Sequence, residues 1–245
     1  MGAALKADEV RAVLDKARRV AVLTGAGISA ESSIPTFRDA LTGLWARFNP
    51  QELATPEAFE RNPTLVWDWY AERRTKVATC SPNPGHLALA ELERRTPEFL
   101  LITQNVDGLH QAAGSRKMVE LHGNIRRVKC SRDCGIVDAW KGGERPPACP
   151  GCGAFLRPDV VWFGEMMPEQ EFARASLAAR NADVFLSIGT SNLVEPAASL
   201  TWLAHGHGAT VVIVNPDMEG QRSGARIIQV NATAGEFLPM LVHRA

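Results

Sequence analysis

The chain has 245 residues, of which 45% are hydrophobic and 22% are charged, and 27 basic side chains balance 27 acidic ones. A net charge of zero and a pI near 7.0 argue against a nucleic-acid-binding protein, which needs a basic field. The charged N-terminal segment lacks the apolar core of a secretory signal, and no apolar run is long enough to span a bilayer. We therefore expect one globular, cytoplasmic protein without nucleic-acid or membrane partners. Its oligomeric state is not predicted.

The first predicted elements are a helix over 8–18 and a buried strand at Val20–Leu23. Gly25 and Gly27 end the strand, and a helix is predicted to start after them. Glycines before a helix N-terminus can bind phosphate, and Gly25, Gly27 and Ala30 fit the dinucleotide-binding spacing. The same pattern also fits a tight strand-to-helix turn. No acidic residue follows about 20 residues later, where a dehydrogenase binds its ribose.

Further helices and strands alternate along the chain. Thr55 is expected to cap a helix that starts at Pro56. The later expected helices cover 64–79, 84–95, 169–180, 196–204 and 234–242, and the strands cover 99–103, 117–121, 125–129, 159–162, 184–188, 210–214 and 226–230.

Polar residues follow the ends of these strands. Parallel strands present their carboxyl ends at one edge of the sheet, where ligands bind in open α/β folds. A single Gly, Asn or Asp there also fits an ordinary turn, but five such ends together indicate a rim for a polar, phosphate-bearing ligand. The residues are Gly25, Ala26, Gly27, Gln104, Asn105, Asp107, His122, Gly189, Thr190, Ser191, Asn215 and Asp217.

Four cysteines, Cys130, Cys134, Cys149 and Cys152, form two close pairs. Four thiolates can complete a tetrahedron around zinc without an open position, which predicts one structural ion. The fifth, Cys80, has no partner. The predicted fold class is α/β, a Rossmann-like doubly wound parallel sheet made by 1–124 and 164–245, with an insertion of helices and a loop near 38–80 and a small zinc-binding lobe at 125–163.

Several motifs together resemble those of the sirtuins, the NAD-dependent protein-lysine deacylases. They are GAGISAESSIPTFR at 25–38, TQNVDGLH at 103–110, LHG at 121–123, VVWFGE at 160–165, GTS at 189–191 and AGEFLP at 234–239, together with the paired cysteines. The resemblance covers nearly the whole chain. It implies that NAD is a co-substrate and that acyl-lysine proteins or peptides are the partners. One departure is Asp159, where close bacterial relatives carry histidine.

The resemblance implies that His122 is the general base, for which an imidazole suits neutral pH, and the following Gly123 leaves its ring room. Asn105 and Asp107 would bind the nicotinamide carboxamide and ribose, although an Asx turn also fits them. The other implied cofactor residues are Gly25, Ala26, Gly27, Ser29, Phe37, Arg38, Trp45, Gln104, Gly189, Thr190, Ser191, Asn215, Asp217 and Ala234. The remaining histidines are interpreted as structural or surface residues.

Tyr70 and Arg73 lie one helical turn apart, and Tyr70 is the only tyrosine. Spacing alone also fits a packed tyrosine and a solvated arginine. The pair resembles that of sirtuins that remove succinyl and malonyl groups, with the guanidinium paired to the acyl carboxylate. Val161, Trp162, Phe163 and Gly164 would pair with the substrate peptide as a β-strand.

The hypothesis is therefore NAD-dependent removal of acetyl, and also of succinyl or malonyl, groups from protein lysines. The alternatives are an NAD-dependent mono-ADP-ribosyltransferase, a non-catalytic NAD- or zinc-binding interaction protein, and a dehydrogenase.

Overall fold

A six-stranded parallel sheet forms the larger part of the computed structural model, which describes residues 2–35, 50–140, 143–192, 194–218 and 223–243. The strand order is β3-β2-β1-β6-β7-β8. The strands are β1 (Arg19–Thr24), β2 (Glu98–Thr103), β3 (Met118–Glu120), β6 (Val184–Ile188), β7 (Thr210–Val214) and β8 (Ile227–Val230). The predicted doubly wound parallel sheet is confirmed.

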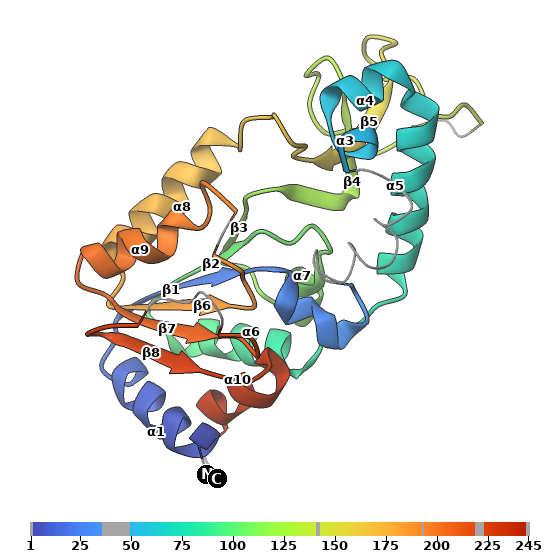
Figure 1. The fold of residues 1–245 in the computed structure, drawn as a ribbon. Helices are drawn as coiled ribbons and strands as arrows, with labels where there is room; N and C mark the ends of the chain where they lie inside the picture. Colours follow the sequence, from blue (N-terminus) through green and yellow to red (C-terminus); the bar gives the residue numbers. More distant parts are fainter. Residues whose placement is uncertain (1, 36–49, 141–142, 193, 219–222, 244–245) are drawn as a thin grey trace.

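The central strands are continuously apolar because helices cover both faces of the sheet. On one side lie α1 (Gly2–Leu14), α6 (Pro84–Arg95) and α10 (Ala234–Val242), and on the other lie α8 (Glu169–Asn181) and α9 (Ser199–Gly206) (Figure 1). Alternate residues of β1 therefore enter different cores, with Val22 in the first and Leu23 in the second. This two-sided burial explains why short apolar runs were sufficient to locate the strands.

A smaller, antiparallel sheet stands beside the large one and consists of β4 (Gly123–Cys130) and β5 (Leu156–Val160). The helices α3 (Pro50–Leu53), α4 (Pro56–Arg61) and α5 (Pro63–Ala78) lie next to it (Figure 1). The Thr55 hydroxyl accepts the Ala58 N–H, so the predicted cap of α4 is confirmed. We propose the predicted boundaries, 125–163 for the lobe and the rest for the large domain, as the division of the chain.

The structure differs from the expected elements in several places. α1 begins at Gly2 instead of residue 8, and the helix after the glycines is a short 3-10 helix, η1 (Ala26–Ser32). α7 (Leu109–Ala113) was not predicted, because it has only five residues and left-handed glycines flank it. β5 ends at Val160, two residues early, since the Trp162 N–H binds the Glu165 carboxylate instead of a neighbouring strand.

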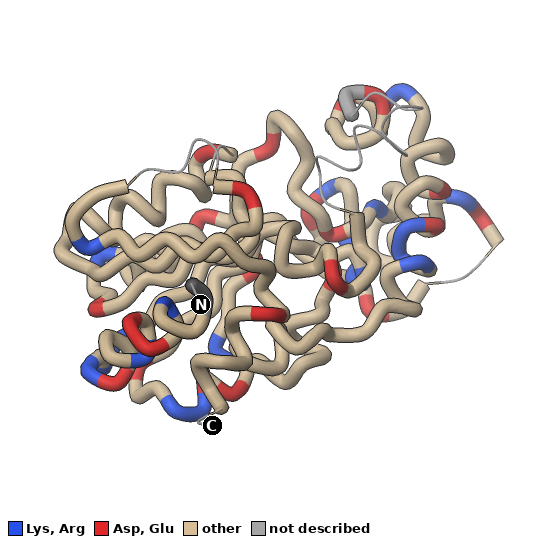
Figure 2. The backbone as a smooth tube through the Cα atoms, turned by 60° about the horizontal axis from the view of Figure 1, so that its bottom comes forward, with Lys and Arg blue, Asp and Glu red and all other residues tan. Residues whose placement is uncertain are grey.

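Acidic and basic residues lie beside one another in both parts of the molecule (Figure 2). Within the described ranges, none of the helices combines the length and the apolar character that crossing a membrane requires.

Candidate active site

The strand order changes direction at β1, which has β2 on one side and β6 on the other. Gly25 and Gly27 follow β1 and pack against Gly189 after β6, with the Gly27 N–H donating to the Gly189 carbonyl at 2.8 Å. A Cβ on Gly25 would lie 2.8 Å from the Gly189 oxygen, and one on Gly27 2.7 Å from its Cα. Only glycine fits at this glycine crossing, where the loop after β1 packs against the loop after β6. Ligands of doubly wound sheets bind at such a switch point.

Side chains from neighbouring strand ends surround these glycines. The Asn105 amide donates to the Gly25 carbonyl at 3.1 Å, and the Gln104 amide donates to the Thr190 hydroxyl at 3.2 Å. The Asn215 amide donates to the Thr190 carbonyl at 3.0 Å. Four of the five strand ends predicted to form the rim are therefore joined here, and they carry amide and hydroxyl groups of the kind that suit a dinucleotide.

Ser29 and Asp107 lie beneath this rim and are buried. The Ser29 hydroxyl donates to Asp107 at 2.8 Å and accepts the Asn105 amide at 3.1 Å, while the Leu109 N–H donates to the other Asp107 oxygen. Burial raises the pKa of Asp107, although the Leu109 and Ser29 donors oppose the shift. These contacts hold Asn105 in a single orientation.

His122 lies between β3 and β4 and is half-buried. Its Nδ1 atom is 3.0 Å from the main-chain oxygen of Gln104. A carbonyl can only accept, so Nδ1 carries the hydrogen and Nε2 keeps its lone pair. Burial lowers the pKa of His122, partly offset by the Gln104 bond, so the ring is neutral near pH 7. A neutral imidazole with a bare Nε2 is suited to accept a proton.

The four paired cysteines converge in the small lobe, with all Sγ atoms within 4.8 Å of one another. Cys130 and Cys149 are buried, whereas Cys134 and Cys152 are exposed. A zinc–sulfur distance of about 2.3 Å places tetrahedral ligands roughly 3.8 Å apart, so this spacing fits one zinc ion. Three residues separate Cys130 from Cys134, one more than is usual, but the four sulfur atoms still come together.

The comparisons with known proteins agree with this geometry. A model described as the Sir2 family matches residues 25–196. The chain belongs to the Sir2 family. It is 52% identical over 235 residues to an NAD-dependent protein deacylase of Ralstonia nicotianae, with 96% of this chain and 95% of that relative covered.

Solved Sir2 structures show the same architecture. One described as a Sir2 homologue–NAD complex has a TM-score of 0.87 and 43% identity, with 96% of this chain and 92% of that chain covered. Another, a Sir2 complex with a deacetylated p53 peptide and 3′-O-acetyl ADP-ribose, has a TM-score of 0.83 and 30% identity, with 96% of both chains covered. The Rossmann-like layout and an NAD-binding role are therefore shared with this Sir2-family chain.

Two buried histidines, His86 and His110, lie under the rim with their ring centroids 4.8 Å apart. His86 Nε2 is 3.5 Å from the Ser29 hydroxyl, and His110 Nε2 is 3.0 Å from that of Thr24. Burial lowers the pKa of His86 to about 4 and that of His110 well below its usual value. Both rings are therefore neutral supports of the Sir2 site. Both were interpreted from the sequence as structural or surface residues, and of the two only His110 lies in one of the motifs, the TQNVDGLH run.

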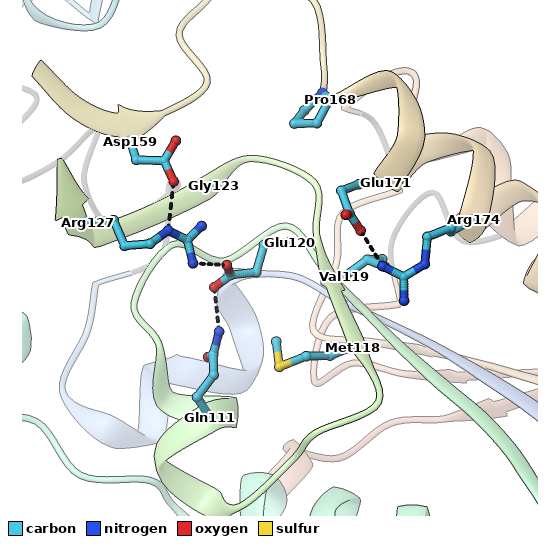
Figure 3. A pocket seen from close by; sticks show the side chains of 10 residues that line it. All are labelled: Gln111, Met118, Val119, Glu120, Gly123, Arg127, Asp159, Pro168, Glu171 and Arg174. Atoms are coloured by element: carbon cyan, nitrogen blue, oxygen red, sulfur yellow. Dashed lines mark hydrogen bonds and ion pairs between the residues drawn. The ribbon is translucent and has the colours of Figure 1, made fainter. Parts of the chain in front are cut away.

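A cavity of about 310 Å³, lined in part by Glu120 and by Gly123, the residue after His122, includes an ionic network (Figure 3). Arg127 of β4 donates to Glu120 at 2.6 Å and to Asp159 at 2.8 Å. Gln111 and Asn124 also donate to Glu120. The network joins the large sheet to the small one beside His122. Sequence reasoning missed it, although the unusual Asp159 was a signal.

The predicted peptide-binding segment leads out of β5. The Val161 N–H donates to the His122 carbonyl and the Phe163 N–H to that of Ala54, both at 2.9 Å. The Trp162 ring is buried, whereas Phe163 and Gly164 are exposed. The main-chain N–H groups of Val161 and Phe163 are therefore bonded within the chain.

The predicted acyl-binding pair lies on α5. Tyr70 is buried, and its hydroxyl accepts a hydrogen bond from the Trp162 indole N–H at 3.1 Å. The Arg73 guanidinium lies 4.5 Å from the centre of the Trp69 ring. Burial lowers the pKa of Arg73, and the nearby Tyr70 partly opposes this shift. The guanidinium and the phenol are therefore both partly shielded from water. Phe37, Arg38 and Trp45, also predicted cofactor residues, lie outside the described residues.

Proposed function

We propose that this Sir2-family protein is an NAD-dependent deacylase of protein lysines, which removes acetyl groups and also succinyl or malonyl groups. The products are nicotinamide, O-acyl-ADP-ribose and free lysine. The relatives' shared name supports the reaction, and one observation of this chain carries it: His122 presents an unprotonated Nε2 beside the rim where glycines and amides meet.

NAD, when bound, supplies the glycosidic carbon that captures the acyl oxygen as nicotinamide leaves. The residues of this chain provide the surroundings for that exchange. Asn105 and Asp107 are proposed to bind the carboxamide and ribose, with Ser29 keeping both in place. His122 accepts a proton at Nε2 from a hydroxyl group of the reactants, while Nδ1–H stays bound to the Gln104 carbonyl.

The remaining cofactor contacts are proposed on the same basis. The glycine crossing and Thr190 would approach the phosphates and the adenosine ribose, and Asn215 is held next to them by the Thr190 carbonyl. Ala234, the first residue of α10, would lie near the adenine. The further contacts follow from the predicted set, namely Ala26, Ser191 and Asp217.

The acyl preference is the finer part of the proposal. An acidic acyl chain would place its carboxylate between the Arg73 guanidinium and the Tyr70 hydroxyl. Each hydrogen bond to a charged group contributes about 1.5–3 kcal/mol. This is sufficient to favour a succinyl or malonyl substrate over an acetyl one by a factor of ten or more. The partly desolvated Arg73 supports this assignment.

The partners are acyl-lysine proteins or peptides, which backbone pairing along Val161–Gly164 would bind with little sequence preference. We place the reaction in a reducing compartment such as the cytoplasm, since the four cysteines must stay reduced to bind zinc.

The decisive experiment incubates the protein with NAD and matched acetyl-, malonyl- and succinyl-lysine peptides and measures nicotinamide and O-acyl-ADP-ribose by mass spectrometry. Wild-type protein should release one nicotinamide for each lysine freed, and His122→Ala should lose about 100-fold or more in turnover with an unchanged circular dichroism spectrum. A parallel incubation with radiolabelled NAD tests the alternative. Release of nicotinamide without peptide deacylation, or transfer of the radiolabel to protein, would contradict the proposal and favour ADP-ribosyl transfer.

A further inference from the structure

Arg157 of β5 is a buried arginine whose guanidinium lies over the Trp162 ring. Its guanidinium carbon is 3.3 Å from the ring centre, and the side chain is only 9% exposed. The guanidinium donates to the Glu165 carboxylate at 2.9 Å and to the Val160 carbonyl at 3.0 Å. Its Nε–H has no partner among the described residues. The Trp162 ring, the Glu165 carboxylate and the Val160 carbonyl therefore hold this arginine together, and one of its donors stays unpaired.

Glu165 binds the main chain of the same tryptophan. Its carboxylate accepts the Trp162 N–H at 2.8 Å, and the Glu165 N–H donates to the Trp162 carbonyl at 3.0 Å. Burial alone would raise the pKa of Glu165, but the Arg157 and Trp162 donors outweigh it and lower the pKa. The carboxylate thus stays charged, and Trp162 is fixed both at its ring and at its backbone.

Trp162 in turn contacts Tyr70 of the predicted acyl-binding pair. Its indole N–H donates to the Tyr70 hydroxyl at 3.1 Å. A phenol that accepts this bond keeps its own hydrogen for another acceptor. Tyr70 also packs edge-on against Trp69, with ring centroids 4.7 Å apart, and Arg73 stacks on the same Trp69 ring. One continuous chain of contacts therefore runs from Arg157 and Glu165 to the two residues proposed to bind the acyl carboxylate.

We propose that Arg157 and Glu165 are positioning residues for recognition of acidic acyl groups, acting through Trp162 on the Tyr70 hydroxyl. The inference rests on the proposed function, because it assumes that Tyr70 donates to a succinyl or malonyl carboxylate. With Trp162 fixed, the indole N–H occupies the acceptor side of the phenol, and the phenolic hydrogen is directed at the ligand. With Trp162 loosened, the hydroxyl rotates among several partners and the preference for acidic acyl chains weakens.

The first test is a double-mutant cycle on acyl preference, measured as kcat/KM for a succinyl-lysine peptide divided by that for the matched acetyl-lysine peptide. Arg157→Lys keeps the charge beside Glu165 but removes the planar stack, and it should lower the ratio about fivefold. In a Tyr70→Phe background, the same substitution should leave the ratio unchanged, because its effect passes through the hydroxyl. Arg145→Lys is the matched control, since Arg145 pairs with Asp68 of α5 at an exposed site.

The second test needs no turnover. Because Tyr70 is the only tyrosine, protein labelled with ¹³C at the tyrosine Cζ gives a single resonance that needs no assignment. Arg157→Lys and Glu165→Gln should shift this resonance in the free protein toward its position in Trp162→Phe, which lacks the indole donor. If Arg157→Lys does not fold, as judged by thermal melting, Glu165→Gln and Trp162→Phe provide the same comparison.

The outcomes separate the two proposals. Wild-type protein that releases no nicotinamide with any acyl peptide overturns the proposed function, and the Cζ resonance then decides whether Arg157 positions Tyr70. Active protein whose acyl ratio is unchanged by Arg157→Lys overturns the positioning role alone. An equal effect of Arg157→Lys with and without the Tyr70 hydroxyl, or an unshifted Cζ resonance, overturns it too.

Discussion

The hydrogen of the His122 ring belongs on Nδ1, because that atom lies 3.0 Å from the Gln104 main-chain oxygen. A base must be unprotonated to act, and burial lowers the pKa of His122 below the ordinary 6.5. We therefore expect kcat/KM to fall toward acidic pH with a midpoint below 6.5. The measurement is a pH profile of nicotinamide release at saturating NAD.

Gln104→Ala is the control for this profile. It removes the amide that donates to Thr190 but keeps the carbonyl that binds His122. NAD affinity should weaken, while the acidic midpoint stays where it is in the wild type. A midpoint above 6.5 in the wild type would contradict the prediction, because a His122 with a lowered pKa would already be unprotonated at that pH.

Substitution of Arg73 should change acyl preference more than turnover. In Arg73→Met the side chain keeps most of its packing on Trp69 but loses its charge, so desuccinylation should fall about tenfold or more relative to deacetylation. The check is kcat/KM on the matched peptides, with Lys76→Met, an exposed residue of the same helix, as control. Equal losses on both peptides would show that Arg73 supports the fold or NAD binding instead.

These expectations also show what the sequence could provide. Continuous apolar runs located β6 and β7 to the residue, since a strand buried on both faces admits few polar side chains. The residues after each run then identified the rim, because parallel strands end at one edge. His122 was found in this way, although the tautomer that makes it a base depends on a carbonyl 18 residues away.

Contacts between distant elements were beyond that reasoning. Tyr70 and Trp162 are 92 residues apart, and their hydrogen bond depends on how α5 packs against the segment after β5. Spacing within one helix gave Tyr70 a neighbour in Arg73 but gave no sign of its partner in the lobe. The burial of His86 was likewise hidden, because no local motif marks a residue that packs across the molecule.

Removal of zinc should unfold the small lobe. Cys130 and Cys149 are part of a core with Trp67, Val128 and Leu156, so the metal ligands and the apolar packing depend on each other. Structural zinc sites contribute folding free energy directly. A chelator should release one zinc per chain and lower the melting temperature, while Cys80→Ala should leave the zinc content at one. Metal-free protein with an unchanged melting curve would contradict the structural role.

Gly123, the residue after His122, has no room for a methyl group. Its φ is +78°, and an added Cβ would lie 2.2 Å from the Asp159 carbonyl oxygen, where β4 begins to pair with β5. The sequence suggested only that this glycine leaves the ring room. We expect Gly123→Ala to lower the free energy of unfolding by about 3 kcal/mol or more and to reduce turnover, because the adjacent His122 carbonyl binds Val161.

Gly114→Ala separates the two causes of that loss. Gly114 also has a positive φ, +102°, but nothing lies within 4 Å of the position its Cβ would take. Backbone strain alone should cost it about 1–2 kcal/mol, with turnover close to wild type. Chemical denaturation of the two variants measures the difference. If they lose equal stability, then strain in the turn accounts for Gly123, and the close approach of β5 behind His122 does not.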